Sequence, residues 1–236
     1  MKRTGIALLS AAALLAAGGV SAGEMDGGSD ISWTYGQVGF VKPDGSGSGS
    51  GGISGNGYDV AASIGISKHW HAGARWSSVN ILQDGGGFLG GDATSDTYEF
   101  TGGWNAGLTT HSQAYIDLGY LTNSIKSKKK NLVPSLDGAE GKIHGVKLTA
   151  GVRYKPVQAV EVGAAITYRQ AHANQDFIPD SNVHDTSLNL SGQYFIFPAW
   201  SLGASVDLSG GGVGGTQGGD TFNVFTRYSF GYRISQ

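Results

Sequence analysis

Apolar and polar residues alternate along most of the chain, and the alternation recurs in ten separate segments. In the last of these, DTFNVFTRYSFGYRI, large or β-favouring side chains occupy every second position from Phe222 to Ile234. A period of two predicts β-strands, because successive side chains of a strand point to opposite faces of the sheet. The ten predicted strands span residues 31–42, 58–67, 70–77, 98–105, 114–120, 146–154, 160–169, 188–194, 200–208 and 220–234.

The connections between these segments alternate between long and short. Short ones fall near residues 67–69, 107–112, 155–156 and 197–199, and long ones, mostly rich in glycine, near 43–57, 81–96, 123–143, 171–184 and 209–219. Barrels that cross an outer membrane have short turns on one side, long loops on the other and an even strand number. We therefore predict an all-β fold: a closed, antiparallel transmembrane β-barrel of ten strands, with eight as the alternative, short periplasmic turns and long Gly-rich outer loops.

The first and last segments are expected to pair and close the barrel. The register of the first segment is the least regular, because Trp33 and Tyr35 suggest one face whereas Val38 and Phe40 suggest the other. A bulge or twist near Gly36 would reconcile the two sets.

The N-terminal residues have the pattern of an export signal. Lys2 and Arg3 precede an alanine-rich apolar run at 6–20, and Val20-Ser21-Ala22 has the small residues of a cleavage site. We predict a signal peptide at 1–22, cleaved near Ala22, and a single barrel domain at 23–236. No later segment is a continuous apolar run long enough for a membrane helix, so membrane insertion would require a closed barrel.

The amino-acid composition argues against several classes of protein and of binding site. The 41 glycines and 5 prolines disfavour a helical protein, and the absence of cysteine excludes disulfides, thiolate metal sites and cysteine lipidation. The net charge of -2 argues against nucleic acid as a partner.

Aromatic side chains gather at both ends of the outward-facing sets. Tyrosine and tryptophan favour the boundary between lipid and water, where the ring meets lipid and the polar edge meets water. The predicted aromatic girdles are Tyr58, Trp76, Tyr98, Tyr120, Tyr168 and Phe222 at the outer ends, and Trp70, Trp104, Tyr154, Tyr194, Trp200 and Tyr232 at the periplasmic ends.

The signal sequence, the ten alternating segments and the aromatic last strand make the chain resemble the small OmpA-type outer-membrane β-barrel superfamily of Gram-negative bacteria. The resemblance covers roughly residues 31–232. It implies insertion by the outer-membrane assembly machinery, which recognises an aromatic-rich last strand such as Phe222-x-Val224-x-Thr226-x-Tyr228-x-Phe230. We expect a monomer in the outer membrane, in contact with its lipid and lipopolysaccharide.

The inward-facing set holds five acids and five bases. Charges removed from bulk water must pair, and a barrel of about ten strands is narrow, so we expect a salt-bridge network that plugs the lumen. The predicted members are Asp59, Arg75, Glu99, Asp117, Lys147, Arg153, Glu161, Arg169, Asp207 and Arg227. This predicts a structural or surface-interaction role. The alternative is a narrow pore for ions or small solutes, because small inward residues would leave space for water in the lumen. These residues are the glycines at 65, 73, 103, 119, 151, 163 and 203.

Catalytic and metal sites have weaker support in the sequence. His69 and His71 share a spacing that could bind a metal, but no third ligand is evident. His172 and His184, with Asp180 and Asp185, would have to converge in one cleft for a hydrolase, which is the second alternative. We therefore predict no enzyme activity, no catalytic or metal site, and no cofactor.

A lysine cluster lies in the longest predicted loop. Clustered bases attract phosphate, so contact with lipopolysaccharide phosphates or another anionic polymer is a hypothesis for this loop, and a solvated loop is the simpler interpretation. Its members are Lys126, Lys128, Lys129 and Lys130.

Overall fold

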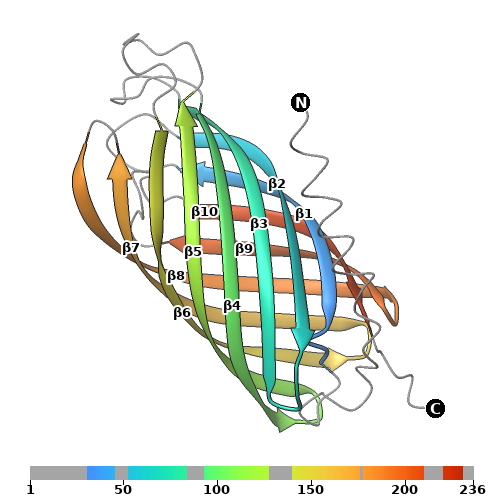
Figure 1. Cartoon of the computed structure of the whole chain (residues 1–236). Coiled ribbons are helices and arrows are strands. Elements are labelled where there is room, and N and C mark those ends of the chain that lie inside the picture. Colours follow the sequence, from blue (N-terminus) through green and yellow to red (C-terminus); the bar gives the residue numbers. More distant parts are fainter. Residues whose placement is uncertain are drawn as a thin grey trace.

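The chain forms ten antiparallel strands that close into one barrel (Figure 1). The computed structural model describes residues 31–45, 53–83, 93–127, 140–175, 178–209 and 220–230. Each strand pairs with its neighbours in sequence, and the first pairs with the last, which confirms the predicted fold class. The strands are β1 (Tyr35–Gly45), β2 (Ile53–Gly65), β3 (Trp70–Gln83), β4 (Ala93–Thr109), β5 (Ser112–Ser127), β6 (Glu140–Val157), β7 (Val160–Gln175), β8 (Ile178–Phe197), β9 (Trp200–Ser209) and β10 (Asp220–Ser229).

The predicted signal peptide, residues 1–22, lies outside the described residues, as do most of the long Gly-rich connections. Within the described ranges, no helix is long and apolar enough to cross a membrane.

Closure between β1 and β10 follows the predicted pairing. The register runs without a shift from Tyr35 opposite Ser229 to Asp44 opposite Asp220. The predicted bulge near Gly36 is wrong, because β1 begins at Tyr35 and ordinary alternation already places Tyr35 on the lumen side and Val38 outside. Trp33 precedes the strand, and its side chain lies in the lumen. Its orientation is therefore set by how the chain enters the barrel, and it gives no information about the register of β1.

The barrel has its apolar side chains outside and its polar side chains inside. Through the body of every strand pair, odd-numbered residues pair with odd-numbered residues, and these face the lumen. Even-numbered apolar residues face outward and stay exposed; Phe100, Leu118 and Ile166 expose 58, 65 and 58% of their surface. Buried polar residues such as Asp59 and Gln113 lie on the inner face. The distribution of polar and apolar side chains is thus the reverse of that in a soluble protein, and it follows from the period-two pattern.

Several strands are longer than predicted. The predicted loop at 171–184 is wrong in extent, because β7 continues to Gln175 and β8 begins at Ile178. Outward residues in this region, such as His172, Asn182 and His184, are polar. The backbone ladder of an antiparallel hairpin continues regardless of what the outer face contacts, so the strands persist where the apolar alternation ends.

Candidate functional site

Ion pairs between strands lie in the lumen. The pairs are Arg75–Asp59 at 3.2 Å, Lys147–Glu99, Arg153–Glu161 at 2.7 Å, and Arg169 with Asp185 at 3.0 Å and with Asp207 at 3.2 Å. Each joins residues from different strands, so the pairs tie the barrel wall together across its interior. The structure thus brings eight of the ten predicted network residues into carboxylate–base pairs.

The other two predicted members have different partners. Asp117 Oδ1 lies 2.8 Å from His71 Nε2, and Arg227 donates to the amide oxygen of Gln37. Asp185 is a network residue that the sequence interpretation missed, because position 185 lies before the predicted strand at 188–194. Continuing the inward odd-numbered parity of β8 upstream from Asn189 would have found it.

Inward glycines are covered by neighbouring side chains. A Cβ on Gly103 would collide with Asp117 and His71, and one on Gly119 would lie 2.9 Å from the Lys147 side chain. Aromatic rings cover two more: Tyr115 lies over Gly151 and Phe225 over Gly203. These glycines therefore give space to polar and aromatic side chains that reach across the wall. Beside these four glycines, the space on which the narrow-pore alternative depended is occupied by those side chains.

The segment before β1 lies inside the lumen at the end that carries the short turns. Trp33 stacks on the His71 ring with centroids 3.7 Å apart, and its Nε1 donates to Gln113 Oε1 at 2.7 Å. Arg153 lies 4.7 Å from the centre of the Trp33 ring and donates to the Ser32 carbonyl. We call residues 31–34 the N-terminal cap. Trp33 was predicted as a strand residue, so its role as a cap was missed.

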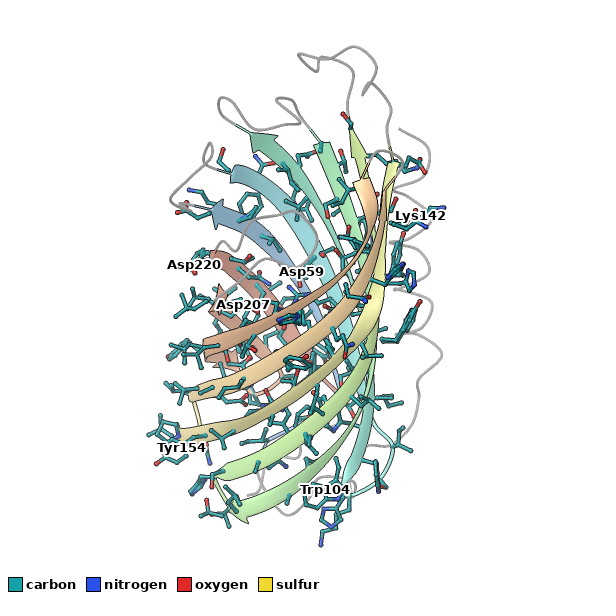
Figure 2. All side chains as sticks on the ribbon, turned by 90° about the vertical axis from the view of Figure 1, so that its left-hand side faces the viewer. Asp59, Trp104, Lys142, Tyr154, Asp207 and Asp220 are labelled. Atoms are coloured by element: carbon teal, nitrogen blue, oxygen red, sulfur yellow. The ribbon has the colours of Figure 1, made fainter. Side chains whose placement is uncertain are left out.

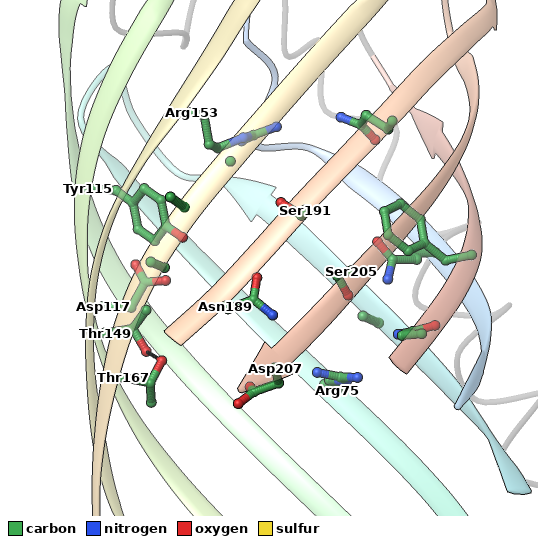
Figure 3. A pocket seen from close by; sticks show the side chains of 18 of the residues that line it. Arg75, Tyr115, Asp117, Thr149, Arg153, Thr167, Asn189, Ser191, Ser205 and Asp207 are labelled. Carbon is green, nitrogen blue, oxygen red and sulfur yellow. Dashed lines mark hydrogen bonds between the residues drawn. The ribbon is translucent and has the colours of Figure 1, made fainter. Parts of the chain in front are cut away.

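A polar cavity remains in the lumen next to this cap. Its volume is about 270 Å³. Tyr115 and Arg153 border it on one side and Arg75 and Asp207 on another (Figure 3). Tyr35, Gln37 and Arg227 also line it.

The metal-site and hydrolase hypotheses both require that the candidate side chains lie close together in space. His71 is buried against Trp33 and Asp117, whereas His69 contacts the Asn105 carbonyl, and no group of three or more possible metal ligands lies together in the described ranges. His184 is exposed on the outer face, but the adjacent Asp185 is buried in the lumen against Arg169.

His172 contacts the exposed Asn182 on the outer side. The side chain of Asp180 lies outside the described residues. The described members of the hydrolase set therefore do not share one cleft.

Ten of the twelve predicted girdle residues are exposed on the outer face. Trp76 is half-buried, and Tyr232 lies outside the described residues. Trp104 and Tyr154 lie toward the short-turn end, opposite Lys142 (Figure 2). The exposed members are Tyr58, Trp70, Tyr98, Trp104, Tyr120, Tyr154, Tyr168, Tyr194, Trp200 and Phe222.

Only the first residue of the lysine cluster can be placed. Lys126 is exposed, and its Nζ lies 2.7 Å from Glu140 Oε1. Lys128, Lys129 and Lys130 lie outside the described residues.

No family model matches the sequence, and no curated protein matches it. Solved structures similar in fold are those of outer-membrane β-barrels. The β domain of the Bordetella autotransporter BrkA is 12% identical over 85% of this chain and 100% of that chain, with a TM-score of 0.47. The translocator domain of the autotransporter NalP from Neisseria meningitidis is 12% identical over 84% and 88%, with a TM-score of 0.46. Ail of Yersinia pestis is 12% identical over 84% and 99%, with a TM-score of 0.36.

Proposed function

We propose that the protein is an outer-membrane barrel with a closed lumen, whose role is structural or a surface interaction. The outer face supports the membrane setting, because apolar side chains such as Leu118 and Ile166 are exposed all around the strands. A monomeric soluble protein rarely exposes so large an apolar surface. In lipid the same surface is stabilising, and the closed barrel leaves no unpaired strand edge.

The observation that carries the closed lumen is the combination of covered glycines and the N-terminal cap. Paired charges occupy the middle of the barrel, and Trp33 fills the short-turn end. A barrel of about ten strands has little interior space beyond its side chains. The protein would therefore hold its outer connections at the cell surface without conducting solute.

A narrow pore is the second candidate. The observation that favours it is the polar cavity of about 270 Å³, lined by Arg75, Asp207 and other charged groups. A path for solute through the lumen would open if the N-terminal cap left the barrel.

The proposed partners follow from the setting. Outer-membrane lipid would contact the aromatic girdles, and lipopolysaccharide phosphates would contact the Lys126 region. The aromatic β10 would be the signal for the assembly machinery, and membership of the small OmpA-type superfamily is part of the same proposal. Exposed apolar residues continue around all strands, which supports a monomer surrounded by lipid.

Conductance in planar lipid bilayers tests the closed lumen. The wild-type protein is expected to insert and give no conductance steps above the bare bilayer. Trp33→Ala, which removes the stacked ring and its hydrogen bond to Gln113, is expected to show resolvable steps. Frequent wild-type openings would overturn the closed-lumen function in favour of the pore. Exposed Trp104→Ala is the matched control, because it removes a tryptophan without touching the cap.

A further inference from the structure

Arg227 differs from the other lumen arginines in its partner. Those arginines and Lys147 each lie within 4.0 Å of a carboxylate oxygen. In the described part of the chain, no carboxylate oxygen lies within that distance of Arg227. Its Nε and Nη2 instead donate to Gln37 Oε1, at 3.1 and 2.9 Å. A neutral amide oxygen accepts these bonds without compensating the charge.

Two aromatic rings fix the Arg227 guanidinium in place. Its Cζ lies 4.1 Å from the centre of the Tyr35 ring and 5.3 Å from that of Phe225. Such contacts stabilise a cation that has lost part of its hydration. The direction of its free N–H groups is therefore set by the barrel wall.

One edge of this guanidinium has no protein acceptor among the described residues. An arginine carries five N–H donors in a fixed plane. Gln37 engages the Nε/Nη2 edge, which leaves the Nη1/Nη2 edge. Glu161 acts on Arg227 electrostatically, but its Oε1 already accepts a hydrogen bond from Arg153 Nε at 2.8 Å and forms an ion pair with Arg153 Nη2 at 2.7 Å. Arg227 is half-buried in the lumen, and a cation removed from bulk water without a bound counter-charge is unfavourable, so an anion at this edge would be stabilising.

The polar cavity provides space at Arg227. Tyr35, Tyr115 and Arg153 line it together with Arg227 and can all donate hydrogen bonds. Its volume of about 270 Å³ is just below the range of drug-sized ligand sites, which starts at about 300 Å³. A ligand of a few heavy atoms fits this size.

We propose that the Nη1/Nη2 edge of Arg227 binds a small oxyanion, a carboxylate or a phosphate, in this cavity. The planar edge of a guanidinium matches two oxygens of such an anion through two parallel charge-assisted hydrogen bonds. The site goes beyond the proposed structural role and does not depend on conductance, since a closed lumen can still hold an anion.

Isothermal titration of the folded full-length protein in detergent tests the site, with acetate and inorganic phosphate as separate probes and choline as the cationic control. Saturable binding is expected for at least one anion, and the two titrations distinguish carboxylate from phosphate as the ligand. Arg227→Gln should weaken binding by about tenfold or more, because the charged donor is lost. Gln37→Glu should weaken it similarly, since the new carboxylate would pair with the retained Arg227.

The matched control is the double variant Asp59→Asn with Arg75→Gln, which removes another cation of the cavity together with its partner. It should bind the anion within about threefold of wild type, because the Arg227 edge is unchanged. Absence of saturable anion binding to the wild type would overturn the proposal. Wild-type affinity in Gln37→Glu, a variant that keeps every lumen cation, would also overturn it. Loss of binding in the double control, with binding retained in Arg227→Gln, would overturn it as well.

Discussion

His71 Nε2 lies 2.8 Å from Asp117 Oδ1, although the two residues belong to strands separated by β4. The contact passes over Gly103, where any Cβ would collide with both side chains. The same relationship recurs at Gly39, beneath the bond from Asn223 to Asp59. Glycine on the inner wall therefore permits polar contacts between strands that are not neighbours.

Gly103→Ala should destabilise the barrel by about 1–3 kcal/mol, because the new methyl group forces His71 and Asp117 apart in a packed interior. Urea unfolding in lipid vesicles measures the change. Gly102→Ala is the matched control, since a Cβ there meets nothing within 4 Å. Equal stability of the two variants would show that the inner wall does not need this glycine.

Glu99→Gln should cost about 3–5 kcal/mol, because it leaves the Lys147 ammonium without its carboxylate in a largely buried site. Adding Lys147→Gln should recover much of the loss, since the double variant buries no unpaired charge. The same unfolding experiment gives the coupling between the two positions. Additive losses would mean that the pair contributes nothing as a pair.

Leu118→Arg tests the lipid face. Leu118 exposes 65% of its surface on the middle of β5, and an arginine facing lipid near the midplane costs about 2–4 kcal/mol. Ser124→Arg, further toward the outer end of the same face, should cost no more than about 1 kcal/mol. A smaller penalty at position 118 than at position 124 would contradict the predicted depth of lipid on β5.

The period-two pattern predicts the barrel, its strand number and the closure of β1 with β10, because lipid outside and polar groups inside impose alternation on each strand. Strand ends are less predictable: β7 and β8 extend where outward residues such as His184 are polar. Interior partners are less predictable again. The pairing of Asp117 with His71 depends on the stagger between the strands of the barrel. The entry of Trp33 into the lumen depends on how the chain approaches β1. Neither feature is encoded in a local sequence pattern.

Fluorescence quenching by lipids that carry brominated acyl chains tests the inside-out architecture most directly. The chain has five tryptophans, so variants that retain one at a time are practical. With Trp104 alone, which is 40% exposed on the outer face, emission should be strongly quenched. With Trp33 alone, which is 7% exposed inside the lumen, emission should be nearly unaffected. Equal quenching of the two, or quenching of Trp33 alone, would contradict a barrel with lipid outside and a capped polar lumen inside.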